Sequence, residues 1–259
     1  MIFDSHIHTE FSADADMKAR EALQAAAGQG IGLVFTEHLD ADYISKEGKT
    51  FTFEPEQYWR TYNPLRGDNL RLGVEIGMRE STRDYSEELS RRVPFDMVIC
   101  SQHIVDDLDI FYPDYYEDKD KQTAYHRYFE QMADNLRGHS FADTLGHIDY
   151  ICRYAPYENA GIVYKDFADE IDKVLQTAVD TDTAMEINTR RLGDKEALAD
   201  LMPIYQRYRE LGGRYVTLGS DAHVPAAVGA HLLLAYDFAE SLHLTPVTFQ
   251  QRQMVNCQK

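Results

Sequence analysis

The sequence has little of several features that would point to particular classes of protein. Its three cysteines, Cys100, Cys152 and Cys257, are an odd number at wide spacing in 259 residues, so they predict no disulfide framework and favour a reducing cytoplasm. No apolar run approaches the ~18 residues that a membrane-spanning helix needs, and residues 1–4 carry no sign of a secretion signal. We therefore expect neither export nor membrane insertion.

Positive charge is also scarce. The chain has 26 lysines and arginines against 44 aspartates and glutamates, which gives a formal net charge of −18. An acidic surface of this kind repels nucleic-acid backbones and anionic membranes, so we expect neither as a partner. A phosphate ester would be repelled as well, unless bound cations reverse the field locally.

Short apolar runs alternate along the chain with longer segments of helical periodicity. This alternation is typical of an α/β protein whose parallel strands are joined by crossover helices. No internal repeat, low-complexity tract or linker divides the chain, so we expect one domain over 1–259, of the size of a β/α barrel. The predicted strands are 2–4, 33–36, 72–75, 97–101, 144–146, 184–187 and 215–218.

Two segments between these runs lack a clear periodicity. Residues 40–55 and 105–119 are rich in polar and aromatic side chains. Connections of this length and composition are typical of loops that lie over a site. We expect both to cover one end of the predicted sheet.

Side chains that can bind metal stand where the predicted strands end. His6 and His8 follow the first strand two residues apart, and because side chains alternate along a strand, both project from the same face. The carboxyl ends of all strands of a β/α barrel meet at one face, where active sites are built, so such residues would share one pocket. The others at strand ends are His38, Glu75, His103, His147, Asp221 and His223.

Packing alone explains this set poorly. A single pair such as His6 and His8 is about as often a satisfied structural pair as a ligand pair, but packing has no reason to gather six of the ten histidines beside two carboxylates. Imidazole and carboxylate without cysteine suit zinc, manganese or iron, and the set exceeds what one ion accepts. We therefore predict two or three divalent transition-metal ions with a bridging carboxylate. No role is assigned to His126, His139, His231 and His243.

Three arginines follow the fifth and sixth predicted strands on the same face. Arg153 comes after the fifth, and Arg190 and Arg191 come after the sixth. A planar guanidinium can hold two phosphate oxygens at once, so arginines beside metal ions favour a phosphate substrate. For each one alone, pairing with one of the 44 acidic residues is an equally good explanation.

The metal-binding residues resemble those of the polymerase-and-histidinol-phosphatase (PHP) family of metallohydrolases, in the family's order and over nearly the whole chain. Within the family, residues 145–149, 153–154 and 186–189 look like the histidinol-phosphate phosphatase branch. The matching ligand positions are His6, His8, Asp14, His38, Glu75, His103, His147, Asp221 and His223.

The resemblance implies a distorted seven-stranded, TIM-like β/α barrel that holds three metal ions, with Glu75 bridging two of them. The implied ligand sets are His6, His8, Glu75 and Asp221 for the first ion, Glu75, His103 and His147 for the second, and Asp14, His38 and His223 for the third.

This chain departs from a common form of the branch at two places. Histidine often stands at the position of Asp14, so Asp16 stays open as the alternative ligand. A small residue often follows the Asn-Thr pair where this chain has Arg190 and Arg191, and Arg190 is our choice as the phosphate ligand.

The predicted reaction is hydrolysis of a phosphate monoester. Bound cations would lower the pKa of a bridging water and give a hydroxide that attacks phosphorus, with Glu75, Asp221 and His223 as the catalytic residues. On resemblance alone the substrate is L-histidinol phosphate, which is hydrolysed in histidine biosynthesis. The alternatives are a PHP-type phosphatase for a phosphotyrosine protein or a nucleotide, and a metal-binding protein without catalysis.

Overall fold

A mostly parallel sheet forms the centre of an α/β fold in the computed structural model, which describes residues 1–259. The sheet has nine strands in the order β1-β2-β3-β4-β7-β8-β9-β10-β11, and only the last pair is antiparallel. The strands are β1 (Phe3–Ile7), β2 (Gly32–Leu39), β3 (Leu70–Gly77), β4 (Met97–Ser101), β7 (Thr144–Leu145), β8 (Ala184–Asn188), β9 (Tyr215–Gly219), β10 (Thr245–Gln250) and β11 (Gln253–Asn256).

All seven predicted strands are present, but a closed seven-stranded barrel is not confirmed. The sheet continues into β10 and β11, which the sequence did not reveal because β10 contains Pro246 and β11 is exposed along its length. At the other edge, the Asp221 N–H donates to the His6 carbonyl and the His8 N–H donates to the Ala222 carbonyl, both at 2.9 Å. The carboxyl ends of β1 and β9 therefore lie side by side.

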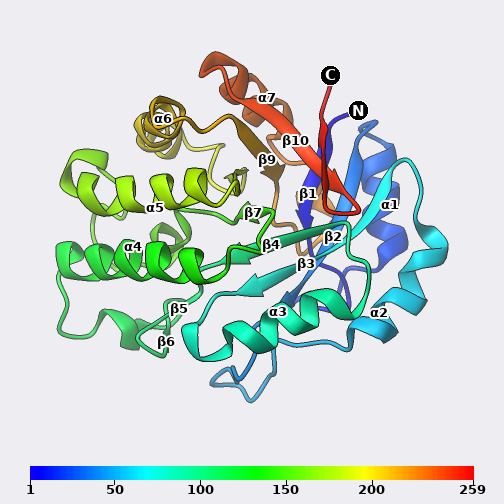
Figure 1. Cartoon of the computed structure of the whole chain (residues 1–259), viewed down its shortest axis with the longest axis horizontal. Helices are drawn as coiled ribbons and strands as arrows, with labels where there is room; N and C mark the ends of the chain where they lie inside the picture. Colours follow the sequence, from blue (N-terminus) through cyan, green and yellow to red (C-terminus); the bar gives the residue numbers. More distant parts are fainter.

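Seven helices lie around the outside of the strands (Figure 1). The strands they cover are apolar and buried on both faces, as the continuous runs in the sequence predicted. The helices are α1 (Ala19–Ala27), α2 (Pro55–Tyr62), α3 (Arg83–Arg92), α4 (Lys121–Gly138), α5 (Ala168–Asp180), α6 (Lys195–Glu210) and α7 (Leu232–Ser241), with short 3-10 helices η1 (Asn63–Leu65), η2 (Glu80–Thr82), η3 (Pro113–Tyr116), η4 (Tyr150–Arg153), η5 (Tyr164–Asp166) and η6 (Pro225–Ala227).

The two segments predicted as loops are linked to each other. Residues 40–55 carry no strand of the main sheet, whereas the second segment contains a small hairpin, β5 (Ile104–Val105) and β6 (Leu108–Asp109), followed by η3. The Tyr43 hydroxyl donates to the Asp109 carboxylate. The Tyr112 hydroxyl donates to Glu47 Oε2 at 2.6 Å. These two hydrogen bonds hold residues 40–55 and 105–119 against each other.

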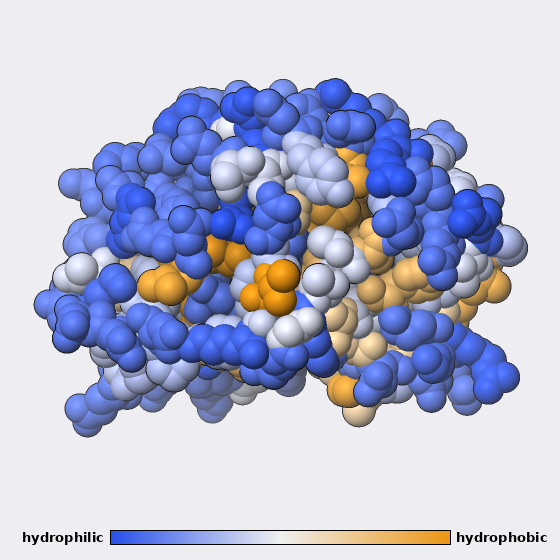
Figure 2. Space-filling view, turned by 90° about the horizontal axis from the view of Figure 1, so that it is seen from below, coloured by the Kyte–Doolittle hydropathy of each residue, from blue (hydrophilic) through white to orange (hydrophobic).

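The molecular surface is mostly hydrophilic on the face seen in Figure 2, where hydrophobic residues gather near the middle and to one side. This agrees with the net charge of −18. None of the helices has the length and apolar character needed to cross a membrane.

The hairpin of β10 and β11 is fastened to the strands beneath it through its turn. Gln251 and Arg252 form a two-residue turn with φ of 51° and 62°, a left-handed pair that matches the twist of a hairpin. The Gln251 N–H donates to Asp96 Oδ1 at 3.0 Å. The Arg252 side chain donates to the Asp143 carboxylate and to the Phe141 carbonyl. The turn therefore adds to the pairing of β10 with β9 in holding the hairpin in place.

Replacing Arg252 with alanine should lower the free energy of unfolding by about 2–3 kcal/mol, because the largely buried Asp143 would lose its counter-charge. Arg209→Ala is the matched control, since Arg209 is exposed, and we expect a change within about 0.5 kcal/mol. Urea denaturation of both variants measures the difference. Equal stability of the two would mean that Arg252 does not fasten the hairpin.

Candidate metal centre

Glu75, near the end of β3, lies at the centre of a cluster of buried histidines. Its side chain and that of His6 are fully buried. Oε1 lies 3.3 Å from His6 Nε2, 3.3 Å from His103 Nε2 and 3.0 Å from His147 Nε2, and Oε2 lies 3.6 Å from His8 Nε2 and 2.8 Å from His38 Nδ1.

The register of the sheet brings these residues together. Parallel pairing sets His38 of β2 directly beside Glu75 of β3. His103 and His147 follow the ends of β4 and β7, the next two strands of the sheet. Because the strands are parallel, the residues at their carboxyl ends reach the same edge, as the sequence predicted.

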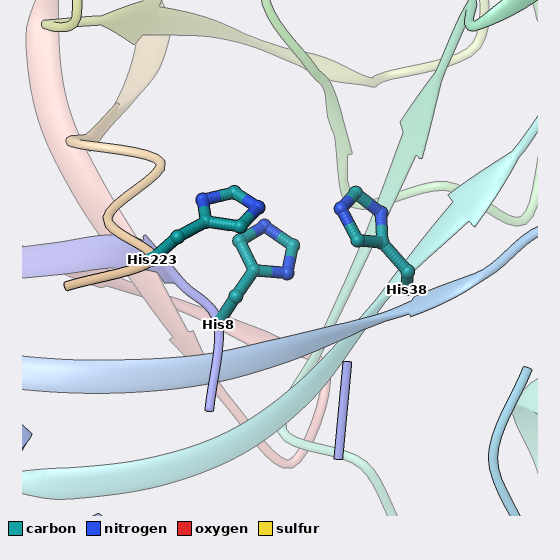
Figure 3. A group of neighbouring side chains, drawn as sticks. All are labelled: His8, His38 and His223. Atoms are coloured by element: carbon teal, nitrogen blue, oxygen red, sulfur yellow. The ribbon is translucent and has the colours of Figure 1, made fainter. Parts of the chain in front are cut away.

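A second group surrounds Asp14. Its Oδ2 lies 3.5 Å from His38 Nε2 and 3.2 Å from His223 Nε2. The ring of His8 lies between the other two imidazoles (Figure 3), with centroids 4.1 Å from His38 and 4.3 Å from His223. Asp16 is exposed and forms no ion pair with these histidines. Of the two aspartates, the structure thus brings only Asp14 to the cluster.

All nine sequence-predicted ligand residues meet in this cluster, and their chemistry suits metal ions. Buried atoms that can bind metal, such as His6 Nε2, His8 Nε2 and Glu75 Oε2, have no hydrogen-bond partner, an arrangement that cations at the centre would satisfy. Four groups have ligand atoms within 4.8 Å of one another: His6, His8 and Asp221; His6, Glu75 and His147; His8, His38 and His223; and His38, Asp40 and His103.

The outer nitrogens of three histidines contact oxygen atoms of residues to which the sequence gave no role in the cluster. His6 Nδ1 donates to Glu186 Oε1 at 2.7 Å, and His103 Nδ1 donates to Asp40 Oδ1 at 2.9 Å. His8 Nδ1 lies 3.1 Å from the hydroxyl of Ser12, which itself donates to Glu37 Oε2 at 2.6 Å. Such contacts fix the ring orientation and leave Nε2 free to bind metal. Glu37 and Asp40 lie at the carboxyl end of β2, a position that could have marked them, whereas Glu186 lies in the middle of β8.

Two opposing effects set the pKa values in the cluster: burial disfavours the charged form of each group, and neighbouring groups of opposite charge favour it. Burial would raise the pKa of Glu75, but His6 and the other imidazoles hold it well below its usual range. Burial would lower the pKa of His6, but the carboxylates around it, Glu186 foremost, keep it well above the ordinary value. The pKa of His103 is likewise raised to about 10, against burial, by Asp40 and Glu75. When no metal is bound, protons on the rings of His6 and His103 supply the positive charge. Metal ions and protons therefore compete for these two rings.

The arginines differ in where they lie. Arg153, whose side chain is 7% exposed, donates to the Asp221 carboxylate and to Asn188 Oδ1, the latter at 2.9 Å. Arg190 is 46% exposed, with Nη1 3.5 Å from Asp221 Oδ2. Both line a cavity of about 420 Å³ above the cluster. Arg191 does not line it and instead pairs with Asp149 at 2.9 Å. Its expected contact with phosphate is therefore not supported, because its side chain leaves the strand end in another direction.

Fold and cluster together define a class: an α/β protein with metal-binding side chains at the carboxyl ends of parallel strands, below a cavity with arginines. The PHP domain matches residues 4–190, and the chain belongs to the PHP family.

Similar proteins are histidinol-phosphatases. A protein of Clostridium acetobutylicum, named "Probable histidinol-phosphatase", is 42% identical over 98% of this chain and 99% of its own length. The histidinol-phosphatase of Lactococcus lactis is 27% identical over 85% of this chain and 84% of its own. The crystal structure of histidinol phosphate phosphatase from Lactococcus lactis, in complex with zinc, L-histidinol and phosphate, matches with a TM-score of 0.89 and 26% identity over 98% of both chains.

Replacing Glu186 with glutamine should weaken metal binding roughly ten- to a hundredfold, because the amide holds His6 less firmly than the carboxylate does. Glu196→Gln removes the same charge from an exposed position on α6 and should leave metal affinity unchanged. Titration of both variants against a competing chelator, with circular dichroism to establish folding, makes the comparison. Unchanged affinity in a folded Glu186→Gln protein would remove this support from the site.

Proposed function

We propose that the chain is a metal-dependent phosphomonoesterase that hydrolyses L-histidinol phosphate to L-histidinol and phosphate, in histidine biosynthesis. The observation that carries the proposal is the placement of Arg153 and Arg190 in the cavity directly above the buried cluster. A metal cluster alone would suit many reactions, but metal and guanidinium groups that face one cavity favour a phosphoryl group. The similarity to histidinol-phosphatases over the whole chain supports the choice of ester.

We assign the metal ligands as the sequence predicted them. Two or three divalent ions, zinc, manganese or iron, would be held with Glu75 as a bridge. When bound, they would lower the pKa of a water and neutralise charge on the phosphoryl oxygens. The proposed ligands are His6, His8, Asp14, His38, Glu75, His103, His147, Asp221 and His223.

The protein's own groups would bind and orient the phosphate. Arg153 and Arg190 would donate to phosphoryl oxygens, and both already lie against Asp221, a carboxylate that also lies 3.3 Å from His8. Asp221 would thus tie the phosphate site to the metal ligands. His223 Nδ1 lies 2.9 Å from the Asp221 carbonyl, which can only accept. The proton therefore stays on Nδ1, and Nε2 is left free as a ligand.

The size of the cavity favours a small ester over a phosphotyrosine protein. The space of about 420 Å³ lies in the usual range for small-molecule sites, and the loops at 40–55 and 105–119 form part of its wall. A binding protein without catalysis is the weaker alternative, because it would need no arginines beside the cluster.

We propose that residues 1–259 form one domain, and that the strands approach a distorted seven-stranded barrel in which the hydrogen bonds of His6 and His8 to the segment after β9 bring the edges together. We also propose a cytoplasmic location and no nucleic-acid partner, in line with the net charge of −18.

Replacing Arg190 with alanine should lower kcat/KM for L-histidinol phosphate roughly ten- to a hundredfold, which corresponds to about 1.5–3 kcal/mol for one charge-assisted contact. Metal content should not change, because a protonated guanidinium is no ligand. Arg191→Ala is the matched control: the neighbouring arginine pairs with Asp149 outside the cavity, so its loss should lower stability but leave kcat/KM within about threefold. Steady-state measurement of phosphate release from both variants tests this prediction. A large loss of kcat/KM only in Arg191→Ala would show that Arg191, not Arg190, binds the phosphate.

A further inference from the structure

One wall of the cavity is aromatic. Phe111 and Tyr112 come from the loop after β6, and Tyr154 comes from the end of η4; all three line the cavity. The ring of Phe111 lies 4.9 Å from that of Tyr154 and 5.0 Å from that of Tyr112. Substrate held by the cluster would extend its alcohol part toward these rings, whose faces attract cations.

One carboxylate of this wall, Asp109, has no cationic partner. It is partly buried and lines the cavity. Its two oxygens accept hydrogen bonds only from neutral groups, the Tyr43 hydroxyl and the Phe111 N–H, the latter at 2.8 Å. Burial raises the pKa of Asp109 more than these hydrogen bonds lower it, so its negative charge is only partly compensated.

The two lysines of residues 40–55 do not pair with Asp109. Lys49 also lines the cavity, but its ammonium group donates to the Ala13 carbonyl at 2.9 Å. Lys46 pairs with Asp114 at 2.5 Å. Asp109 is therefore left to pair with a positive group of the substrate.

The geometry points to Asp109 as a specificity-determining residue that binds a protonated amine or an imidazolium in the alcohol part of the substrate, with the aromatic rings around it. This rests on the proposed phosphatase function. The cavity would then be complementary to both ends of one molecule, since arginines and metal ions take the phosphoryl group and the aromatic wall with Asp109 takes a cation. An ester of a neutral alcohol would leave the carboxylate of Asp109 unpaired.

The carboxylate is held in place before substrate binds. The Tyr43 hydroxyl donates to Asp109 from the other loop, and the contact of Tyr112 with Glu47 joins the same two loops a second time. A fixed carboxylate binds a cation without the cost of ordering a mobile loop, so its effect on the choice between substrates is larger.

The test compares Asp109→Asn with the wild type on two phosphate esters, L-histidinol phosphate and 4-nitrophenyl phosphate, whose alcohol part carries no charge. We expect kcat/KM for L-histidinol phosphate to fall roughly ten- to a hundredfold, mainly through KM, and kcat/KM for 4-nitrophenyl phosphate to stay within about threefold. Glu117→Gln removes one charge from the same segment outside the cavity and should change neither value. Retained cleavage of 4-nitrophenyl phosphate also shows that the variant is folded.

Equal losses on both esters, or no loss on either, would overturn the inference. If the wild type cleaves 4-nitrophenyl phosphate but not L-histidinol phosphate, the proposed function fails separately. O-Phosphoethanolamine and ethyl phosphate then serve as the cationic and neutral esters. The role of Asp109 is supported if the wild type prefers O-phosphoethanolamine and Asp109→Asn abolishes that preference. If the wild type shows no such preference, or Asp109→Asn retains it, the inference is wrong.

Discussion

The structure of the site depends on one buried negative charge, the carboxylate of Glu75. A carboxylate with no access to water costs several kcal/mol unless positive charge surrounds it, and here the imidazoles of His6, His38 and His103 keep its pKa far below the usual range. Those imidazoles come from different strands, so the charge can be compensated only when the strands are aligned in register. Alignment of the strands in register is therefore a condition for forming the site.

The space around Glu75 also constrains residues that carry no charge. A Cβ atom at Gly219 would collide with Glu186 and with the Cβ of His6, and one at Gly77 would collide with the carboxylate of Asp40. Glycine at these two positions lets the outer carboxylates approach the strands closely enough to orient His6 and His103. The hydrogen bonds of these carboxylates thus hold the cluster in place, and the two glycines leave room for the carboxylates.

The strands and most residues of the cluster could be predicted from the sequence because both follow from local patterns, whereas Asp14 follows no strand and was predicted only from the family resemblance. Continuous apolar runs marked the seven strands, and parallel strands place whatever follows their carboxyl ends at one edge. The role of Glu186 could not be predicted, because it depends on a partner 180 residues away. Arg190 and Arg191 could not be told apart either, since neighbouring side chains after a strand leave in different directions. The β10–β11 hairpin was missed because its outer strand is exposed and has no apolar run.

The central claim, that metal held around Glu75 performs phosphate-ester hydrolysis, is tested most directly by measuring metal content and phosphate release on the same samples of wild type and Glu75→Gln. The account predicts more than one equivalent of transition metal per chain in the wild type, release of phosphate from L-histidinol phosphate that a chelator abolishes, and loss of metal and turnover together in Glu75→Gln, because a neutral amide bridges two cations poorly. Full turnover by metal-free wild-type protein, or normal metal content and turnover in Glu75→Gln, would contradict it.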